Sequence, residues 1–227
     1  MAKPRNALSS NARRRRPRRL RDDLAVLLDR TDKVIAQARC RVAGTQPDGA
    51  TRLVSLHEPD ARPISKGRLG KPTEFGYKAQ VVDNVEGIIL DYSVHVGNPS
   101  DTGLLRPAIT NIIGLLAMKP VLVTADRGYW DTKIEADLTT AGVTTIVIPR
   151  TGKPSKARAE IQRADSFVAA VKWRTGCEGR ISHLKRDCGW RRTRLRSHNG
   201  ARTWCAHGVF THNLVKINRI NTSRLRQ

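Results

Sequence analysis

Apolar positions change their spacing along the chain from helical to alternating, and these changes predict its elements. In residues 22–42, leucine, valine and isoleucine recur every three or four positions between charged residues, which predicts one or two helices. Residues 43–50 contain Gly, Pro and Asp-Gly and are typical of a loop. Beyond this loop the apolar residues are denser and partly alternate, which indicates strands.

The rest of the pattern predicts adjacent strands first, and then strands and helices in alternation. Strands are expected at 51–60, 75–83, 87–96, 121–126 and 143–149, and helices at 99–118, 131–142, 159–187 and 203–220. The runs at 121–126 and 143–149 are short and apolar, as in strands buried on both faces. This order predicts an α/β fold in which helices cover a mixed sheet.

The N-terminal segment is strongly basic. Residues 1–21 carry nine Lys or Arg and no acidic residue, and we expect them to form a disordered basic arm. The whole chain of 227 residues has 42 Lys and Arg against 20 Asp and Glu, a formal net charge of +22. Because 39% of the residues are hydrophobic, the chain can still bury a core. This combination favours nucleic acid as the partner, ahead of an acidic membrane surface.

Several classes of protein are not favoured. No stretch of 18 or more apolar residues predicts a transmembrane helix, and the charged N-terminus lacks the apolar segment of a secretory signal. Four cysteines in 227 residues do not make a disulfide framework, so a cytoplasmic location is expected. The cysteines and histidines between 177 and 212 lack the pair spacings of a zinc site, which makes structural zinc a minor alternative.

Three carboxylates stand where metal chemistry would need them. Asp60 ends the first expected strand and Asp126 ends the fourth, and reactive groups of open sheets gather beyond strand ends. An Asp in such a position can equally be a turn former or a helix cap. Glu178 lies within 171–202, where ten residues are Lys or Arg and only two are acidic. It is either a Mg²⁺ ligand in a phosphate-binding surface or a partner for neighbouring charges.

The spacing around Glu178 resembles a known signature. Arg174, Glu178 and Lys185 read R-x3-E-x6-K, with Val171 at the usual tyrosine position, and they share one helix face. This pattern resembles the C-terminal signature of bacterial insertion-sequence transposases of the DDE type. Four further segments are similar to motifs of those enzymes: FGYKAQVVDNVEGIILDYSVHVGNPSD, VTADRGYWD, WRTGCEGRISHLKRDCGWRRTR and HNLVKI. The resemblance covers roughly residues 51–220.

The resemblance implies a fold, a reaction and partners. It implies an RNase H-like catalytic domain over 51–220, with a mixed five-stranded sheet flanked by helices, after a helical segment and loop at 22–50 and before a flexible tail at 221–227. Asp60, Asp126 and Glu178 would bind two Mg²⁺ or Mn²⁺ ions for DNA strand cleavage and strand transfer. The partners would be transposon ends and target DNA in a synaptic homodimer, at a cytoplasmic, nucleoid-associated location.

Some alternatives stay open. Glu58 and Asp83 compete with Asp60 as the first acidic ligand; Asp60 is preferred because it precedes the hairpin as the family order requires, whereas Asp83 lies at the turn between the two hairpin strands. A truncated, inactive transposase that only binds DNA is the alternative function, and a general RNase H-like nuclease is a third. Trp190 is a candidate both for base stacking and for packing. The candidate phosphate contacts are Arg174, Lys185, Arg191, Arg192, Arg194 and Arg196.

Overall fold

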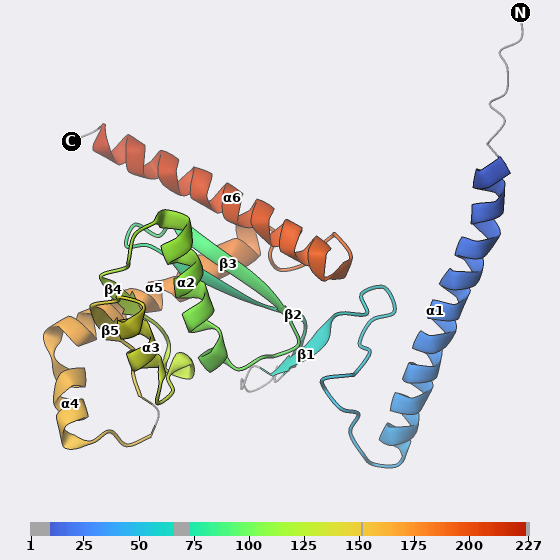
Figure 1. Ribbon diagram of the computed structural model, residues 1–227, viewed down its shortest axis with the longest axis horizontal. Coiled ribbons are helices and arrows are strands. Elements are labelled where there is room, and N and C mark those ends of the chain that lie inside the picture. Colours follow the sequence, from blue (N-terminus) through green and yellow to red (C-terminus); the bar gives the residue numbers. More distant parts are fainter. Residues whose placement is uncertain (1–9, 66–72, 151, 226–227) are drawn as a thin grey trace, which may run out of the picture. The chain divides into compact units, whose positions relative to one another are not determined.

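The computed structural model describes residues 10–65, 73–150 and 152–225. It is a mixed α/β structure, which confirms the expected class (Figure 1). The chain divides into two compact units, Met1–Phe75 and Gly76–Gln227. The first unit contains α1 (Ser10–Val42) and β1 (Arg62–Ser65), and β2 (Thr73–Asp83) begins at its end. Each unit is described by itself below.

Helix α1 is longer than the sequence pattern predicts. It begins at Ser10, so residues 10–21, which we expected to be disordered, are helical, while residues 1–9 lie outside the described part. Arginine, leucine and alanine lose little side-chain freedom in a helix, so this composition favours a helix despite the like charges. Pro17 lies inside α1 and cannot donate a backbone hydrogen bond there.

The strand expected at residues 51–60 is wrong: these residues form turns and irregular backbone, and β1 follows them. Side chains of α1 satisfy their backbone groups instead. The Gln37 amide accepts a hydrogen bond from Leu53 N at 2.7 Å and donates one to Leu53 O at 3.0 Å. Arg30 donates to Leu56 O at 2.7 Å. Backbone groups bonded to side chains are not available to a strand ladder.

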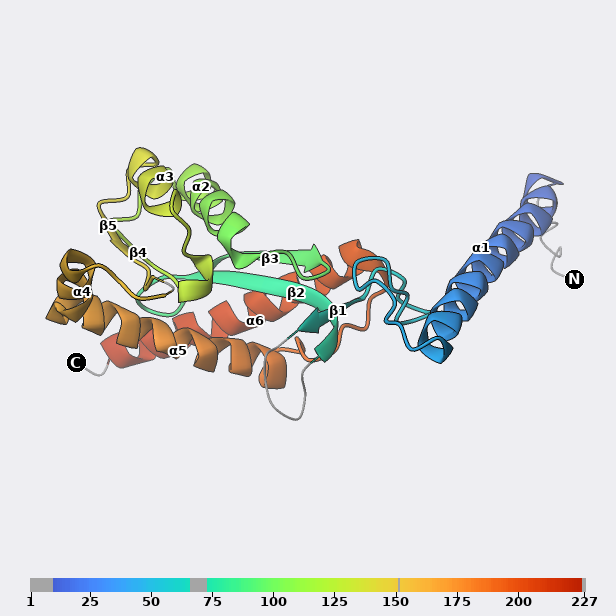
Figure 2. The same cartoon turned by 90° about the horizontal axis from the view of Figure 1, so that it is seen from below.

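The second unit places helices on both sides of its strands. Figure 2 shows α2 and α3 on one side and α5 and α6 on the other. Its elements are the remainder of β2, β3 (Ile89–Val96), the short helix η1 (Asp101–Gly103), α2 (Leu105–Leu116), β4 (Leu122–Thr124), the short helix η2 (Arg127–Tyr129), α3 (Ile134–Thr140), β5 (Thr145–Val147), α4 (Lys156–Arg163), α5 (Asp165–Asp187) and α6 (Ser197–Arg224). Helix α6 therefore includes residues 221–224 of the expected flexible tail.

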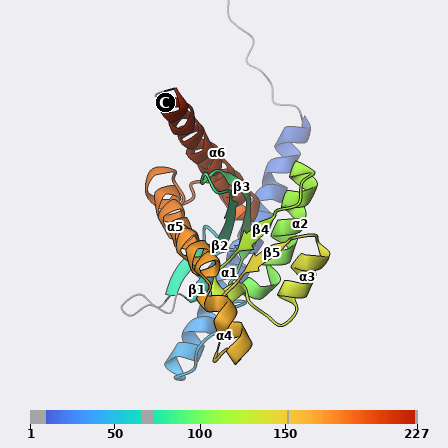
Figure 3. The ribbon, with the colours of Figure 1, turned by 90° about the vertical axis from the view of Figure 1, so that its left-hand side faces the viewer.

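The described strands form two small sheets rather than one sheet of five strands. The first has the order β1-β2-β3, with β2 and β3 antiparallel from Tyr77 opposite Val96 to Asp83 opposite Ile89. In the second, β4 and β5 are parallel, as Figure 3 shows from their side. Residues 51–60, where the first strand was expected, belong to neither sheet.

A buried apolar cluster fixes the end of β4. Leu105 and Ile109 of α2 and Leu138 of α3 pack with Val123 of β4 and Ile148 after β5, and each is at least 92% buried. The backbone of Ala125 extends the pairing by donating to Val147 O at 3.3 Å. Residue 126 therefore leaves the sheet from a rigid position.

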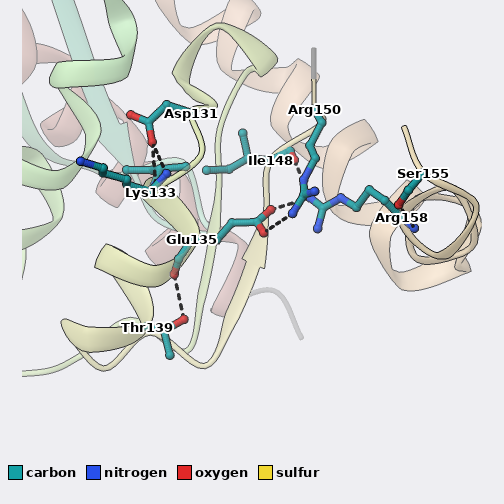
Figure 4. A network of polar contacts seen from close by, with 9 residues as sticks. Asp131, Lys133, Glu135, Thr139, Ile148, Arg150, Ser155 and Arg158 are labelled. Carbon is teal, nitrogen blue, oxygen red and sulfur yellow. Dashed lines mark hydrogen bonds and ion pairs between the residues drawn. The ribbon is translucent and has the colours of Figure 1, made fainter. Parts of the chain in front are cut away.

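A polar network joins α3, the end of β5 and α4 beside this core (Figure 4). Glu135 of α3 accepts from Arg150 at 2.9 Å and lies 2.7 Å from Arg158, which is buried and also donates to Ile148 O at 2.9 Å. Asp131 caps α3 through two 2.7 Å bonds from Lys133 N and Ile134 N. Because buried charges are costly unless paired, this network fixes α4 to the sheet.

Two tryptophans connect α6 to the segment that follows α5. The Trp190 indole donates to Cys205 O of α6 at 3.1 Å, and the Trp204 indole of α6 donates back to Gly189 O at 2.8 Å. Gly208 allows this close approach: a Cβ there would lie 2.5 Å from Trp190 Nε1 and 2.6 Å from Cys188 O. Residues 188–190 are thus held firmly against α6.

Gly208→Ala is expected to lower the free energy of unfolding by about 2 kcal/mol, because overpacking against backbone outweighs the helix propensity of alanine. Urea unfolding followed by circular dichroism measures this change. The matched control is Gly114→Ala in α2, where a Cβ meets no atom within 4 Å. It is expected to raise stability by up to about 1 kcal/mol. Equal effects at both positions would contradict the tryptophan packing.

Candidate active site

Asp126 lies just beyond β4, as the sequence predicts. It caps the short helix η2, and its Oδ1 accepts a hydrogen bond from Arg127 N at 2.7 Å. Its side chain is 58% exposed, and its Oδ2 lies 3.8 Å from Arg174 Nη1 of α5. The carboxylate therefore has a fixed backbone position and a solvent-facing side, and it contacts the helix that carries the R-x3-E-x6-K pattern.

Helix α5 presents that pattern on one face. Arg174, Glu178 and Lys185 are separated by four and seven residues in an uninterrupted helix, so they lie along the same side. Glu178 is exposed, one helical turn or about 6 Å along the axis from Arg174. Because Arg174 contacts Asp126, this face is the one nearest the end of β4. The structure thus brings the end of β4 toward the face that carries Glu178.

Asp60 is placed differently from the expectation. It lies in a turn before β1 rather than at the end of a strand, and Ala61 N donates to Glu58 O in the same turn at 3.1 Å. Asp60 and Glu58 belong to the first unit, whereas Asp126 and Glu178 belong to the second. The role of Asp60 as the first acidic ligand stays a prediction.

Asp83, the other competitor, is engaged elsewhere. Its side chain is only 8% exposed and forms an ion pair with Arg180 of α5, whose side chain is 18% exposed. Burial raises the pKa of the neighbouring Cys177 thiol of α5, and the charge of Asp83 adds to this shift. Trp173 packs its ring 5.2 Å from the Arg180 guanidinium. Burial raises the pKa of the Asp83 carboxyl, and Arg180 opposes this shift. Asp83 therefore fastens α5 to the hairpin, a role that the sequence pattern did not indicate.

Asp101 is a further acidic residue near Asp126, and the sequence pattern did not indicate it as a site residue. Its Oδ1 pairs with Lys78 at 2.7 Å, and its Oδ2 lies so close to Gly128 that a Cβ there would approach it to 3.1 Å. Burial raises the pKa of the Tyr129 hydroxyl, and the charges of Asp101 and Asp126 add to the shift. Asp101 and Asp126 therefore flank the same tyrosine.

The arginines after α5 form an exposed basic loop, residues 188–196. Arg191, Arg192, Arg194 and Arg196 of this loop and Lys185 of α5 are exposed, and none of them takes part in an ion pair found among the described residues. Trp190 is half-buried and bonded to α6, so packing rather than base stacking describes it. The loop thus presents arginines from a fixed backbone.

Within the ranges that the structure describes, no three His, Cys, Asp or Glu side chains lie close enough to hold a metal ion. His183 bonds to Asp187 at 2.6 Å and lies 3.8 Å from Cys188 Sγ. The exposed carboxylates of Asp126 and Glu178 are hard oxygen donors, which suit Mg²⁺ or Mn²⁺ by their chemistry.

Comparison with known families identifies the chain. A model described as the transposase DDE domain matches residues 22–214. The chain belongs to this family, which confirms the resemblance to insertion-sequence DDE transposases and assigns it a transposase function with DNA as partner. Comparisons with curated proteins and with solved structures found no match. No described helix is long and apolar enough to cross a membrane.

Asp83→Ala is expected to lower the free energy of unfolding by about 3 kcal/mol, because Arg180 then keeps a largely buried charge without its partner. Urea unfolding measures the loss. Asp137→Ala is the matched control, since Asp137 pairs with Arg106 at 3.3 Å with both side chains far more exposed. That change is expected to cost at most about 1 kcal/mol. Similar losses in the two variants would show that the Asp83 pair does not fasten α5.

Proposed function

We propose that the chain is an active transposase in which Asp126 and Glu178, with Asp60 as the third carboxylate, hold two divalent metal ions for DNA strand cleavage and strand transfer. The observation that carries this proposal is the contact between Asp126, at the end of β4, and Arg174, on the α5 face that presents Glu178. An RNase H-like catalytic domain belongs to the same proposal.

Each residue of this site has a defined task. Bound Mg²⁺ or Mn²⁺ would activate the attacking oxygen and stabilise the leaving 3′ oxygen. Asp126 supplies a ligand from a rigid strand end, and Glu178 supplies one from a helix that the buried Asp83–Arg180 pair holds in place. Arg174 contacts Asp126 in the free protein and would contact a DNA phosphate when metal neutralises that carboxylate.

The basic loop would hold the DNA backbone beside this site. Its four arginines and Lys185 are exposed and lie at the C-terminal end of α5, beyond Glu178. Phosphate contacts of this kind position the duplex without reading its sequence. Positioning matters because a phosphoryl group must lie in line with the attacking oxygen. The homodimer of a synaptic complex remains a prediction from the resemblance.

The expected result is that Asp126→Asn and Glu178→Gln each reduce strand cleavage at least about 1,000-fold while DNA affinity changes less than about threefold, because the ligands act on the reaction and not on binding. The assay uses a plasmid that carries the element ends, with Mg²⁺ or Mn²⁺ and with EDTA as a blank. Glu160→Gln, an exposed carboxylate of α4, is the matched control and should keep the wild-type rate.

The same assay separates the remaining alternatives. Asp60→Asn and Glu58→Gln are compared, and the variant that loses activity identifies the first acidic ligand. A wild-type chain that binds DNA but cleaves none with either metal would support the truncated, DNA-binding alternative. Cleavage that survives Asp126→Asn would overturn the proposed mechanism.

A further inference from the structure

A second candidate site lies on the other side of α5. Helices α5 and α6 lie next to each other in the second unit (Figure 2), and an open groove of about 220 Å³ runs between them. Gly179, Arg180 and His183 of α5 and His212, Lys216 and Arg219 of α6 line it. Gly179, Arg180 and His183 lie within four residues of one another on α5. They lie on the side of the helix away from Arg174, Glu178 and Lys185.

The charges of the groove favour an anion. Lys216 and Arg219 take part in no ion pair found in the described part of the chain, whereas Arg180 is paired with Asp83. His183 also has a carboxylate partner, Asp187. A cation would meet two unpaired positive charges here, so we exclude a metal ion as the occupant.

A buried histidine points to a ligand in the same groove. His212 is only 5% exposed, and its Nε2–H donates to Gly87 O at 3.0 Å. Its Nδ1 is buried and has no hydrogen-bond partner in the structure. A buried polar atom without a partner costs free energy, and a water ordered by a bound anion would satisfy it.

We propose that this groove binds a backbone phosphate of DNA, so that α5 contacts DNA on two opposite sides. Lys216 and Arg219 supply the charge and the hydrogen-bond donors for the phosphate oxygens. Gly179 leaves space for a ligand in the groove, because a Cβ at this position meets no atom within 4 Å. The proposal takes its ligand class from the transposase function but does not depend on the metal site.

The test is DNA binding by fluorescence anisotropy at several salt concentrations, in EDTA so that no cleavage occurs. Lys216→Gln combined with Arg219→Gln is expected to lower the slope of log affinity against log salt by about 1 to 2 and to weaken binding about tenfold. The matched control combines Lys119→Gln with Lys133→Gln, which removes two exposed lysines near α3, on the side of α2 and α3. It is expected to leave the slope unchanged.

A second pair of variants tests a charge placed inside the groove and separates its effect from folding. Gly179→Glu places an anion in the open space, while Gly179→Gln places a neutral side chain of the same size there. Both replace glycine inside a helix and are expected to keep or raise the melting temperature. Gly179→Glu is expected to weaken DNA binding at least fivefold more than Gly179→Gln.

The outcomes decide the proposal. A salt slope unaffected by the double variant, or equal binding by the two Gly179 variants, would overturn it. Inorganic phosphate that stabilises the wild type but not the double variant, with DNA binding unchanged, would make the groove a site for small phosphates and also overturn it. Because no metal is present, these results are independent of whether Asp126 and Glu178 support cleavage.

Discussion

The ion pair between Asp83 and Arg180 is the constraint on which the arrangement of the second unit depends. It joins the end of β2 to the middle of α5 and is largely buried. A paired buried charge tolerates few alternative geometries, because any other rotation of the helix would leave the guanidinium without its carboxylate. Burial raises the pKa of the neighbouring Cys177 thiol, and the charge of Asp83 adds to this shift.

Because the rotation of α5 about its axis is fixed, each side of the helix has a different environment. With Arg180 directed at the hairpin, Arg174 comes to Asp126 and Glu178 stays exposed beside it. From Arg174 to Arg180 the helix advances by about 9 Å, so the buried pair and the candidate active site are neighbours along one helix without sharing a carboxylate. The same rotation leaves Gly179 and His183 in the groove toward α6.

Much of the second unit was predictable because its signals are local. Apolar periodicity located β2 and β3 to within two residues and the helices to within six residues at their ends, although the single helix expected at 159–187 is divided into α4 and α5. The short runs before Asp126 and after Gly142 became β4 and β5. The predictions were wrong where a residue far away in the sequence determines the local structure. Leu53 is bonded to Gln37, sixteen residues earlier, and Asp83 to a residue 97 positions later. Spacing within a segment carries no signal for such pairs, so the irregular backbone at 51–60 and the burial of Asp83 could not be foreseen.

Part of the positive charge of the chain lies on the basic loop of the second unit, whose backbone begins at a segment held against α6. Trp190 and Trp204 each donate their indole hydrogen to backbone carbonyls across the junction of α5 and α6. Trp190 is therefore packed against α6 and does not stack on a nucleic-acid base. The backbone that carries the arginines of the basic loop is held in place. Arginines on a rigid backbone lose less conformational entropy when they bind phosphate than arginines on a disordered arm. In the proposed function, the loop and the groove would therefore orient DNA about α5, whereas charge without fixed geometry would only attract it.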